Sequence, residues 1–139
     1  MHIDLKHIRN HYKNDHFATN SDIVIDSVTE DCVICSMELS EKHKNAVGGI
    51  QGGAIFTLAD LAFAVHCNLA MVCGEDVCMT VGQSCNITYL KSTKGSRLIS
   101  KSTCLSKGNK VSVYRICIED DMGVQIAVMM ANSFTLAKR

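Results

Sequence analysis

The hydropathy pattern contains one long apolar run near the middle of the chain. Residues 45–74 carry a single formal charge, on Asp60. Within this run, residues 52–73 are rich in Ala and Leu and are too many for an ordinary strand, which favours a helix. A helix that is apolar nearly all round is buried on nearly all sides. The pattern therefore predicts a long central helix that begins at Gly52 and is enclosed by the rest of the protein.

The segments on both sides of this run have the composition of β-strands. Those after it are rich in Val, Ile, Thr, Tyr and Cys, and glycine-containing turns separate them, which predicts strands with hairpin-like connections. The strands are expected at residues 23–27 and 31–39, and then at 77–90, 96–106, 110–119 and 124–136. Near the N-terminus, apolar residues spaced three and four apart predict a short amphipathic helix at residues 5–13.

This order of elements predicts one α+β domain over residues 1–139, with residues 1–20 as an N-terminal helical extension. A curved antiparallel sheet would wrap the long helix. The rival interpretation is a transmembrane helix, for which an apolar stretch of ~20 residues is about long enough. It would place Asp60 near the bilayer centre, at a cost of roughly 2.5–3.5 kcal/mol, so no membrane association is expected.

Charge and cysteine content narrow the function classes. Fourteen Lys and Arg residues balance fourteen Asp and Glu residues, so the chain lacks the positive field that nucleic-acid binding needs. The first fifteen residues are charged and lack the apolar segment of a signal peptide. Most of the eight cysteines lie in apolar runs, where free thiols pack as small hydrophobic groups. A reduced, cytoplasmic protein is therefore expected.

Two residue pairs have a spacing that also occurs in metal or redox sites. Cys32 and Cys35 form a CxxC pair, but they fall within a predicted strand, where residues three apart face opposite sides. His7 and His11 are one helical turn apart, without a third ligand at matching spacing. Packing and a solvated helix face explain both pairs, so we expect neither a metal nor another cofactor.

Glycines cluster where the long helix is predicted to begin. Gly52 and Gly53 would open it, and the first N–H groups of a helix have no intrahelical acceptor. Because these residues lack side chains, a ligand can approach closely. They could bind a carbonyl oxygen as an oxyanion hole. The alternative is a loop that simply needs flexible backbone before a buried helix.

Asp60 is the strongest candidate for catalysis. An ionised carboxylate in an apolar helix is energetically costly unless it is paired or neutralised. Downstream of a possible oxyanion hole, such a group is typical of a general base or nucleophile. The alternative is a structural role, with Asp60 bonded to a backbone donor or to His66.

The separation of Gly52 and Asp60 bears on assembly. Eight residues correspond to ~12 Å along one helix, too far for both groups of one chain to act on the same carbon atom. Two antiparallel helices would bring the start of one opposite the Asp60 of the other, and a twofold dimer would form two such sites. We therefore expect a homodimer with shared active sites.

Three segments resemble a known family. Residues 45–53 read NAVGGIQGG, residues 56–64 read FTLADLAFA, and residues 86–90 read NITYL. Together they resemble acyl-CoA thioesterases of the phenylacetate-degradation (PaaI) type, and the resemblance extends over residues 23–136. It implies the hotdog fold, a long helix wrapped by a curved antiparallel sheet of five or six strands. It also implies at least a homodimer, and often a dimer of dimers.

The resemblance further implies a reaction and roles for residues. An acyl-CoA or aryl-CoA thioester would be hydrolysed to a free acid and CoA. The N–H of Gly52, helped by Gln51 or Asn45, would bind the thioester carbonyl. Asp60 of the other subunit would activate water or attack directly to give an anhydride, and the sequence favours neither route.

The chain departs from this family at two positions that bear on the chemistry, and it also has Lys91-Ser92 where relatives often have Pro. Many relatives have His before the glycine pair, where this chain has Gln51, which cannot act as an acid near neutral pH. Some relatives have Ser or Thr facing the base from the next strand, where this chain has Gly82. Neighbouring Gln83 or Ser84 could position water instead.

Substrate binding is expected to involve Gly53 and basic residues that meet the CoA phosphates. The candidates fall into two groups, Lys107, Gly108 and Lys110 at one predicted hairpin tip, and Lys91, Lys94 and Arg97. Solvated turn lysines explain either group equally well.

Two other functions stay open. A hotdog dehydratase acting on acyl-CoA or acyl-carrier protein usually has a His in a Pro-containing loop, and this chain has no Pro. A non-catalytic acyl-CoA-binding sensor would normally carry a DNA-binding domain, for which twenty N-terminal residues are too few. A relative that binds without hydrolysing is the remaining alternative, because of Gln51.

Overall fold

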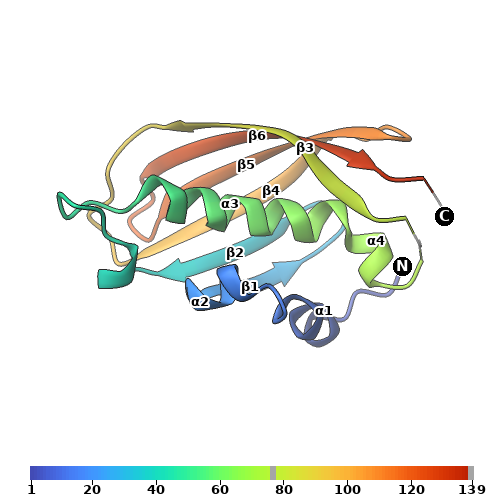
Figure 1. The fold of residues 1–139 in the computed structure, drawn as a ribbon, viewed down its shortest axis with the longest axis horizontal. Helices are drawn as coiled ribbons and strands as arrows, with labels where there is room; N and C mark the ends of the chain where they lie inside the picture. Colours follow the sequence, from blue (N-terminus) through green and yellow to red (C-terminus); the bar gives the residue numbers. More distant parts are fainter. Residues whose placement is uncertain (76–77, 138–139) are drawn as a thin grey trace.

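The computed structural model describes residues 1–75 and 78–137 and contains one six-stranded antiparallel sheet with the strand order β1-β2-β4-β5-β6-β3. The strands are β1 (Ile23–Val28), β2 (Val33–Glu38), β3 (Thr80–Tyr89), β4 (Arg97–Ser106), β5 (Val111–Asp120) and β6 (Gln125–Thr135). The sheet curves around α3 (Gly52–Cys67), which runs along its concave side (Figure 1). The predicted α+β architecture, a long helix wrapped by a curved sheet, is confirmed.

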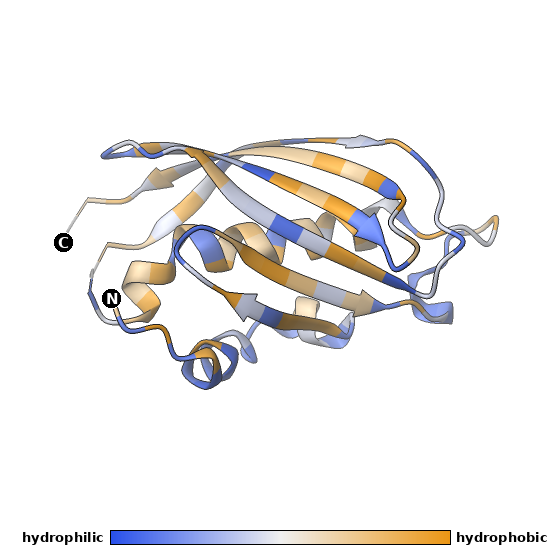
Figure 2. Ribbon diagram, turned by 180° about the vertical axis from the view of Figure 1, so that it is seen from behind, coloured by the Kyte–Doolittle hydropathy of each residue, from blue (hydrophilic) through white to orange (hydrophobic). Residues whose placement is uncertain are grey.

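The core lies between the concave side of the sheet and α3. Alternate strand residues face the helix, as the pleat of a strand requires. The largest fully buried side chains include Met37, Leu98, Ile116 and Met129 from the sheet and Leu58 from α3. Seen from behind, the convex side of the sheet mixes hydrophilic and hydrophobic residues (Figure 2).

The long apolar run forms two helices rather than one. α3 ends at Cys67, and the short α4 (Leu69–Val72) follows it. At the break, the Asn68 side chain donates to the Ala64 and Thr80 carbonyl oxygens and accepts from the Thr80 N–H. The prediction of one helix through residues 52–73 is therefore wrong beyond Cys67, because Asn68 ties the helix end to the start of β3 with side-chain hydrogen bonds.

The connection from β3 to β4 is not a hairpin. β3 pairs with β6 at one edge of the sheet, whereas β4 lies between β2 and β5. The predicted hairpin connections are confirmed between β4, β5 and β6 and wrong at Lys94–Gly95. A turn signal marks where the chain bends and carries no information about which strand becomes the neighbour. Val77, at the predicted start of β3, lies outside the described residues.

The N-terminal extension forms two helices, α1 (Leu5–Tyr12) and α2 (His16–Asn20). The side chains of Asp4 and Asp15 cap them by accepting backbone N–H bonds. Ile8 is fully buried, and the Tyr12 hydroxyl donates to the Ala64 carbonyl oxygen of α3 at 3.1 Å. The sequence did not predict α2, because five residues are too few to establish a hydrophobic period.

In the described part of the chain, no helix has both the length and the hydrophobicity needed to cross a bilayer. The eight cysteines all lie within the described residues, and no two of them form a disulfide. Cys35 is buried in β2, where desolvation raises its pKa to about 12, while Cys32 precedes the strand and is half-buried. A buried thiol with so high a pKa is a packing group rather than a reactive one.

Candidate active site

Asn45 shapes the loop before α3. Its Oδ1 accepts from the Val47 and Gly49 N–H groups at 3.0 and 3.1 Å, and its backbone N–H donates to the Gly49 carbonyl oxygen at 2.7 Å. Gly48 has a φ of 83°, in the left-handed region that glycine adopts without strain. These bonds hold the tight turn that delivers Gln51 to the N-cap position of the helix.

Tyr89, at the end of β3, fixes the first residue of α3. Its hydroxyl donates to the Gly52 carbonyl oxygen at 2.9 Å. A Cβ at residue 52 would lie 3.1 Å from both Cζ and the hydroxyl oxygen of Tyr89, so the close approach favours glycine there. No local sequence pattern predicts this role, because residues 52 and 89 become neighbours only when the sheet closes over α3.

The two glycine N–H groups at the helix start differ in their partners. The Gly52 N–H donates to the Oε1 of Gln51 at 3.2 Å, whereas the Gly53 N–H has no acceptor among the described residues. Gln51 is exposed, so a ligand can displace its side chain. A hollow of about 530 Å³ adjoins this position, and its walls include Asn45, Gly52 and Tyr89. The helix start therefore offers one open donor and a second that a ligand can compete for.

Asp60 reaches the surface along an uncovered stripe of α3. Gly53 and Asp60 are exposed, and Thr57 and Ala64 on the same side are half-buried. Residues spaced three and four apart in this way lie on one face of a helix. The expectation that the helix is enclosed on nearly all sides is wrong for this face, because in one chain the sheet covers the other sides only.

The Asp60 carboxylate has no hydrogen-bond or ion-pair partner among the described residues. Its pKa is raised, first because neighbouring protein atoms displace water from it and second because of the Asp15 carboxylate. Cys85 of β3 is another neighbour, since the Asp60 charge adds to burial in raising the pKa of that thiol. An unpaired carboxylate with a raised pKa is a stronger base than an ordinary one.

The structural alternative for Asp60, a bond to His66, is wrong. His66 is 6% exposed, and its Nε2 lies 2.9 Å from the Glu30 carbonyl oxygen while its Nδ1 lies 3.0 Å from Ser102 Oγ. Because Nε2 must donate to the carbonyl, the neutral ring accepts from Ser102 at Nδ1. Desolvation lowers the pKa of His66, which keeps the ring neutral. Its hydrogen-bonding capacity is fully used within the core.

Gln83 and Ser84 do not converge on Asp60. Gln83 is an exposed extra residue in a β-bulge between Gly82 and Ser84. Ser84 Oγ accepts from Asn132 Nδ2 at 3.0 Å on the convex side of the sheet, since the next residue, Cys85, is the one opposite buried Ala131. Within one chain, Cys85 rather than Ser84 therefore occupies the helix-facing position near Asp60.

The two groups of residues predicted to bind phosphate do not lie together in one chain. Lys107 and Gly108 line a hollow of about 300 Å³ with Cys67 of α3, and Lys107 also lines another hollow together with His66. The Cys67 end of α3 is a helix length away from Gly52, roughly 24 Å for sixteen residues. The Lys110 carbonyl accepts from the Thr135 N–H, so this residue continues the β5–β6 pairing.

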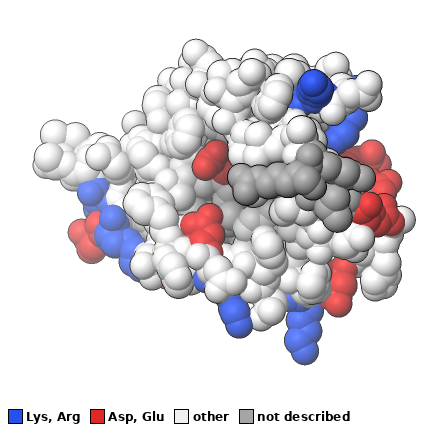
Figure 3. All heavy atoms as spheres, turned by 45° about the vertical axis from the view of Figure 1, so that its right-hand side comes forward, with Lys and Arg blue, Asp and Glu red and all other residues white. Residues whose placement is uncertain are grey.

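In the second group, Lys91 lines the hollow at the helix start, whereas Arg97 pairs with Asp26 and Glu38. Basic and acidic side chains are interspersed on the face shown in Figure 3, without a patch of one sign. No three or more His, Cys, Asp or Glu side chains of residues 1–75 and 78–137 converge to hold a metal ion. Within one chain, Lys91 is therefore the member of these two groups that lines the hollow beside the candidate site.

Solved structures share this arrangement of sheet and helix, which is the hotdog fold. A mutant of the thioesterase PA1618 from Pseudomonas aeruginosa superposes with a TM-score of 0.87 over 98% of this chain and 96% of that one, at 18% identity. The PaaI protein of Escherichia coli, from the phenylacetic acid degradation operon, superposes with a TM-score of 0.82 over 96% and 97% of the two chains, at 26% identity. The predicted fold is confirmed.

Residues 48–127 match the model of the Thioesterase superfamily, and the chain belongs to this family. It is 30% identical to a putative esterase of Archaeoglobus fulgidus over 118 residues, 84% of this chain and 73% of that protein. It is 28% identical to the acyl-coenzyme A thioesterase PaaI of Escherichia coli, over 88% of this chain and 84% of that protein. It is 32% identical to human acyl-coenzyme A thioesterase 13 over 81 residues, 55% of that protein. The predicted PaaI-like type is confirmed.

Proposed function

We propose that this protein hydrolyses an acyl-CoA or aryl-CoA thioester to a free acid and CoA, with Asp60 as the general base or nucleophile. The observation that carries the proposal is the isolation of Asp60. It has no partner among the described residues, and its pKa is raised on an otherwise apolar helix. Membership of the Thioesterase superfamily and the acyl-CoA thioesterases among its relatives support this reaction class.

The active unit in this proposal is a homodimer. Gly52 and Asp60 lie in the same helix, ~12 Å apart, so one chain cannot apply both to one carbon atom. One chain also leaves two features uncovered, the Asp60 face of α3 and the outer edge of β3, most of whose residues are exposed. An unpaired edge strand presents free N–H and C=O groups that favour pairing with another chain. A twofold axis that packs two α3 helices antiparallel covers both features and faces each helix start with the Asp60 of the second copy.

Catalysis then follows from the donors and the base. The thioester oxygen accepts from the Gly53 N–H, and from the Gly52 N–H once the Gln51 side chain moves away, so the developing negative charge is stabilised at the helix start. Asp60 of the second copy takes a proton from water, which attacks the carbonyl carbon, or attacks that carbon itself and forms an anhydride that water hydrolyses. The C–S bond breaks in either route, and CoA leaves as the thiol after it gains a proton.

The same dimer accounts for the distance between the helix start and Lys107. Antiparallel α3 helices bring the start of one toward the C-terminal end of the other, where Lys107 and Gly108 lie. Lys91 of the first chain and Lys107 of the second would then flank one site and meet the phosphates of CoA. A dimer of dimers and a cytoplasmic location stay predictions.

A thiol-release assay over a panel of acyl- and aryl-CoA esters tests the reaction, with Asp60→Asn as the matched variant. Wild type should release thiol from at least one ester, and the variant should be nearly inactive. Tight binding of CoA esters without thiol release would favour a non-catalytic sensor, and water addition to an enoyl ester would favour a dehydratase.

Subunit mixing tests the shared site. Asp60→Asn removes the proposed base. Gly53→Pro removes the N–H donor at the helix start, since proline lacks the N–H. Mixed dimers contain one complete site, so activity should recover toward half of the wild-type value per mixed dimer. No recovery after subunit exchange has been demonstrated, by mass spectrometry of differently labelled chains, would exclude a site shared between subunits.

A further inference from the structure

A second hollow lies beneath the N-terminal extension, and it shares no lining residue with the hollow at the start of α3. Its volume is about 200 Å³, and four elements wall it. Tyr12 of α1, Ala18 of α2, Ile23 of β1 and Leu61 of α3 supply apolar surface, and two cations, Arg9 and Lys13, complete the wall. Tyr12 and the C-cap residue Lys13 follow Arg9 by three and four residues, so one side of α1 presents all three to the hollow.

The two cations are not committed to carboxylates of the protein. Neither Arg9 nor Lys13 forms an ion pair with the described residues. Arg9 donates through Nε to the Ile25 carbonyl oxygen at 2.8 Å, which leaves the terminal nitrogens of its guanidinium group for a ligand. The three nearest carboxylates along the chain are engaged elsewhere, since Asp4 caps α1, Asp15 caps α2 and Asp22 pairs with Lys42.

This combination of size, walls and charge selects a ligand class. At ~30 Å³ per water, the hollow has room for about six or seven waters, which corresponds to one aromatic ring or a short alkyl chain. Apolar walls bind such a body, and a guanidinium and an ammonium group at the rim bind a carboxylate through charge-assisted hydrogen bonds. A neutral ligand would gain no charge-assisted bond from the two cations, and a cationic one would be repelled by them.

We propose that the hollow between α1, α2, β1 and α3 binds a small apolar carboxylic acid. The site goes beyond the proposed hydrolysis and does not depend on it, because it needs only the free acid. All of its named wall residues except Leu61 lie outside residues 48–127, the part that matches the family. Leu61 follows Asp60 in α3, so a bound acid touches the helix that carries the candidate base.

Titration of the protein with phenylacetate, followed by backbone amide NMR shifts, tests the proposal. Saturable shifts should centre on Ala18, Ile23 and Leu61. Phenylacetamide, which has the same shape without the charge, should bind at least about tenfold more weakly, since one charge-assisted hydrogen bond contributes roughly that factor. Shifts centred on Gly53 and Cys85 instead would assign the acid to the proposed active site and overturn the inference.

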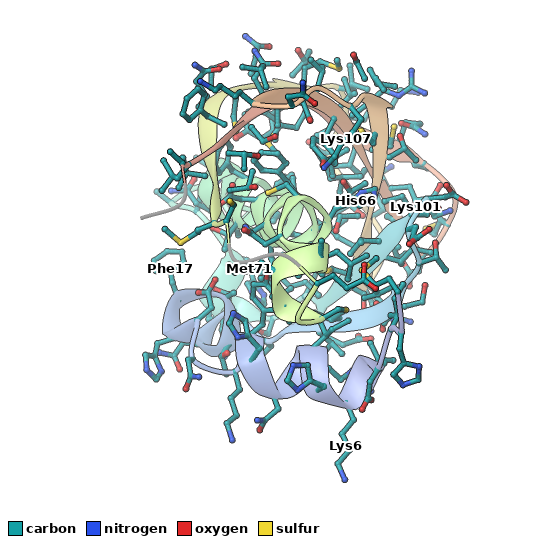
Figure 4. All side chains as sticks on the ribbon, turned by 90° about the vertical axis from the view of Figure 1, so that its right-hand side faces the viewer. Lys6, Phe17, His66, Met71, Lys101 and Lys107 are labelled. Atoms are coloured by element: carbon teal, nitrogen blue, oxygen red, sulfur yellow. The ribbon has the colours of Figure 1, made fainter. Side chains whose placement is uncertain are left out.

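Three variants separate binding from folding. Lys13→Gln removes a cation whose side chain has no hydrogen-bond partner in the described part of the chain, so it should weaken phenylacetate binding about tenfold without changing stability. Arg9→Gln added to Lys13→Gln should abolish saturation. Lys6→Gln is the control, because Lys6 on the same helix points away from the body of the protein into solvent (Figure 4). Equal affinity of Lys13→Gln and wild type would overturn the proposal, even if the double variant failed to fold.

Discussion

Asp60 and His66 are two polar residues on one apolar helix, and their surroundings are opposite. His66 is buried and bonded at both ring nitrogens, whereas Asp60 is exposed and has no partner among the described residues. The difference arises because the sheet covers the His66 side of α3 and leaves the Asp60 side open. A polar residue with all its bonds satisfied stabilises a core, while one with its bonds unused is free to bind or react.

The largest expected effect comes from replacing Asp60, whose carboxylate has no partner among the described residues. Asp60→Asn should lower kcat by about 10²–10⁴, the usual contribution of a general base, and leave the melting temperature unchanged or higher. The raised pKa means that folding disfavours the Asp60 charge, so a neutral amide does not destabilise the fold. Steady-state thiol release and thermal unfolding measure the two quantities. A variant that loses stability in parallel with activity would argue for a structural Asp60.

Removing His66, whose two ring nitrogens are both hydrogen-bonded, should lower stability rather than activity. His66→Ala leaves Ser102 Oγ and the Glu30 carbonyl without their partner and opens a cavity, which should reduce the free energy of unfolding by ~2–4 kcal/mol. The folded fraction should keep its kcat. Urea denaturation measures the loss, and His11→Ala, at an exposed position, is the control.

The lowered pKa of His66 adds a pH dependence to the same experiment. The unfolded chain protonates this ring near its ordinary pKa of about 6.5, before the folded protein does. Stability from the neutral ring is therefore present above about pH 6.5 and is lost as the pH falls toward the lower folded pKa. His66→Ala should flatten this part of the stability profile, and an unchanged profile would show that other groups cause it.

A smaller effect is expected at the helix start. Tyr89→Phe removes the hydroxyl that holds the Gly52 carbonyl, worth ~0.5–1.5 kcal/mol, so kcat should fall by about 2- to 12-fold with little change in KM. Tyr12→Phe is a matched control, because it removes a similar hydroxyl-to-carbonyl bond at Ala64, away from the helix start. Equal kcat values for the two variants would contradict a positioning role for Tyr89.

The smallest effect concerns the tuning of Asp60. Asp15→Asn removes the second cause of its raised pKa and keeps an N-cap for α2, since Asn caps helices as well as Asp. If the ionised carboxylate is the active form, the rate is lost as the pH falls through the Asp60 pKa. The acid limb of the kcat profile should therefore move to lower pH in the variant. A limb that moves to higher pH would contradict the assignment.

Much of the fold could be predicted from the sequence, and the exceptions share a cause. The predicted strands match the observed ones to within three residues where described, because alternation and turn residues are local properties. The break at Asn68, the edge position of β3 and the contact of Tyr89 with Gly52 all depend on residues far apart in sequence. Spacing within one segment carries no information about such contacts.

For the candidate site, the sequence by itself determined that a single carboxylate lies eight residues after the start of an apolar helix, and hence that one chain holds the two groups apart. Helix rise fixes that distance without reference to the rest of the protein. Only the tertiary structure decided that Asp60 is open while His66 is satisfied, that Ser84 faces away, and that Tyr89 holds Gly52. The physical reason is that the curvature and register of the sheet, not the helix, determine which side of each element meets a neighbour.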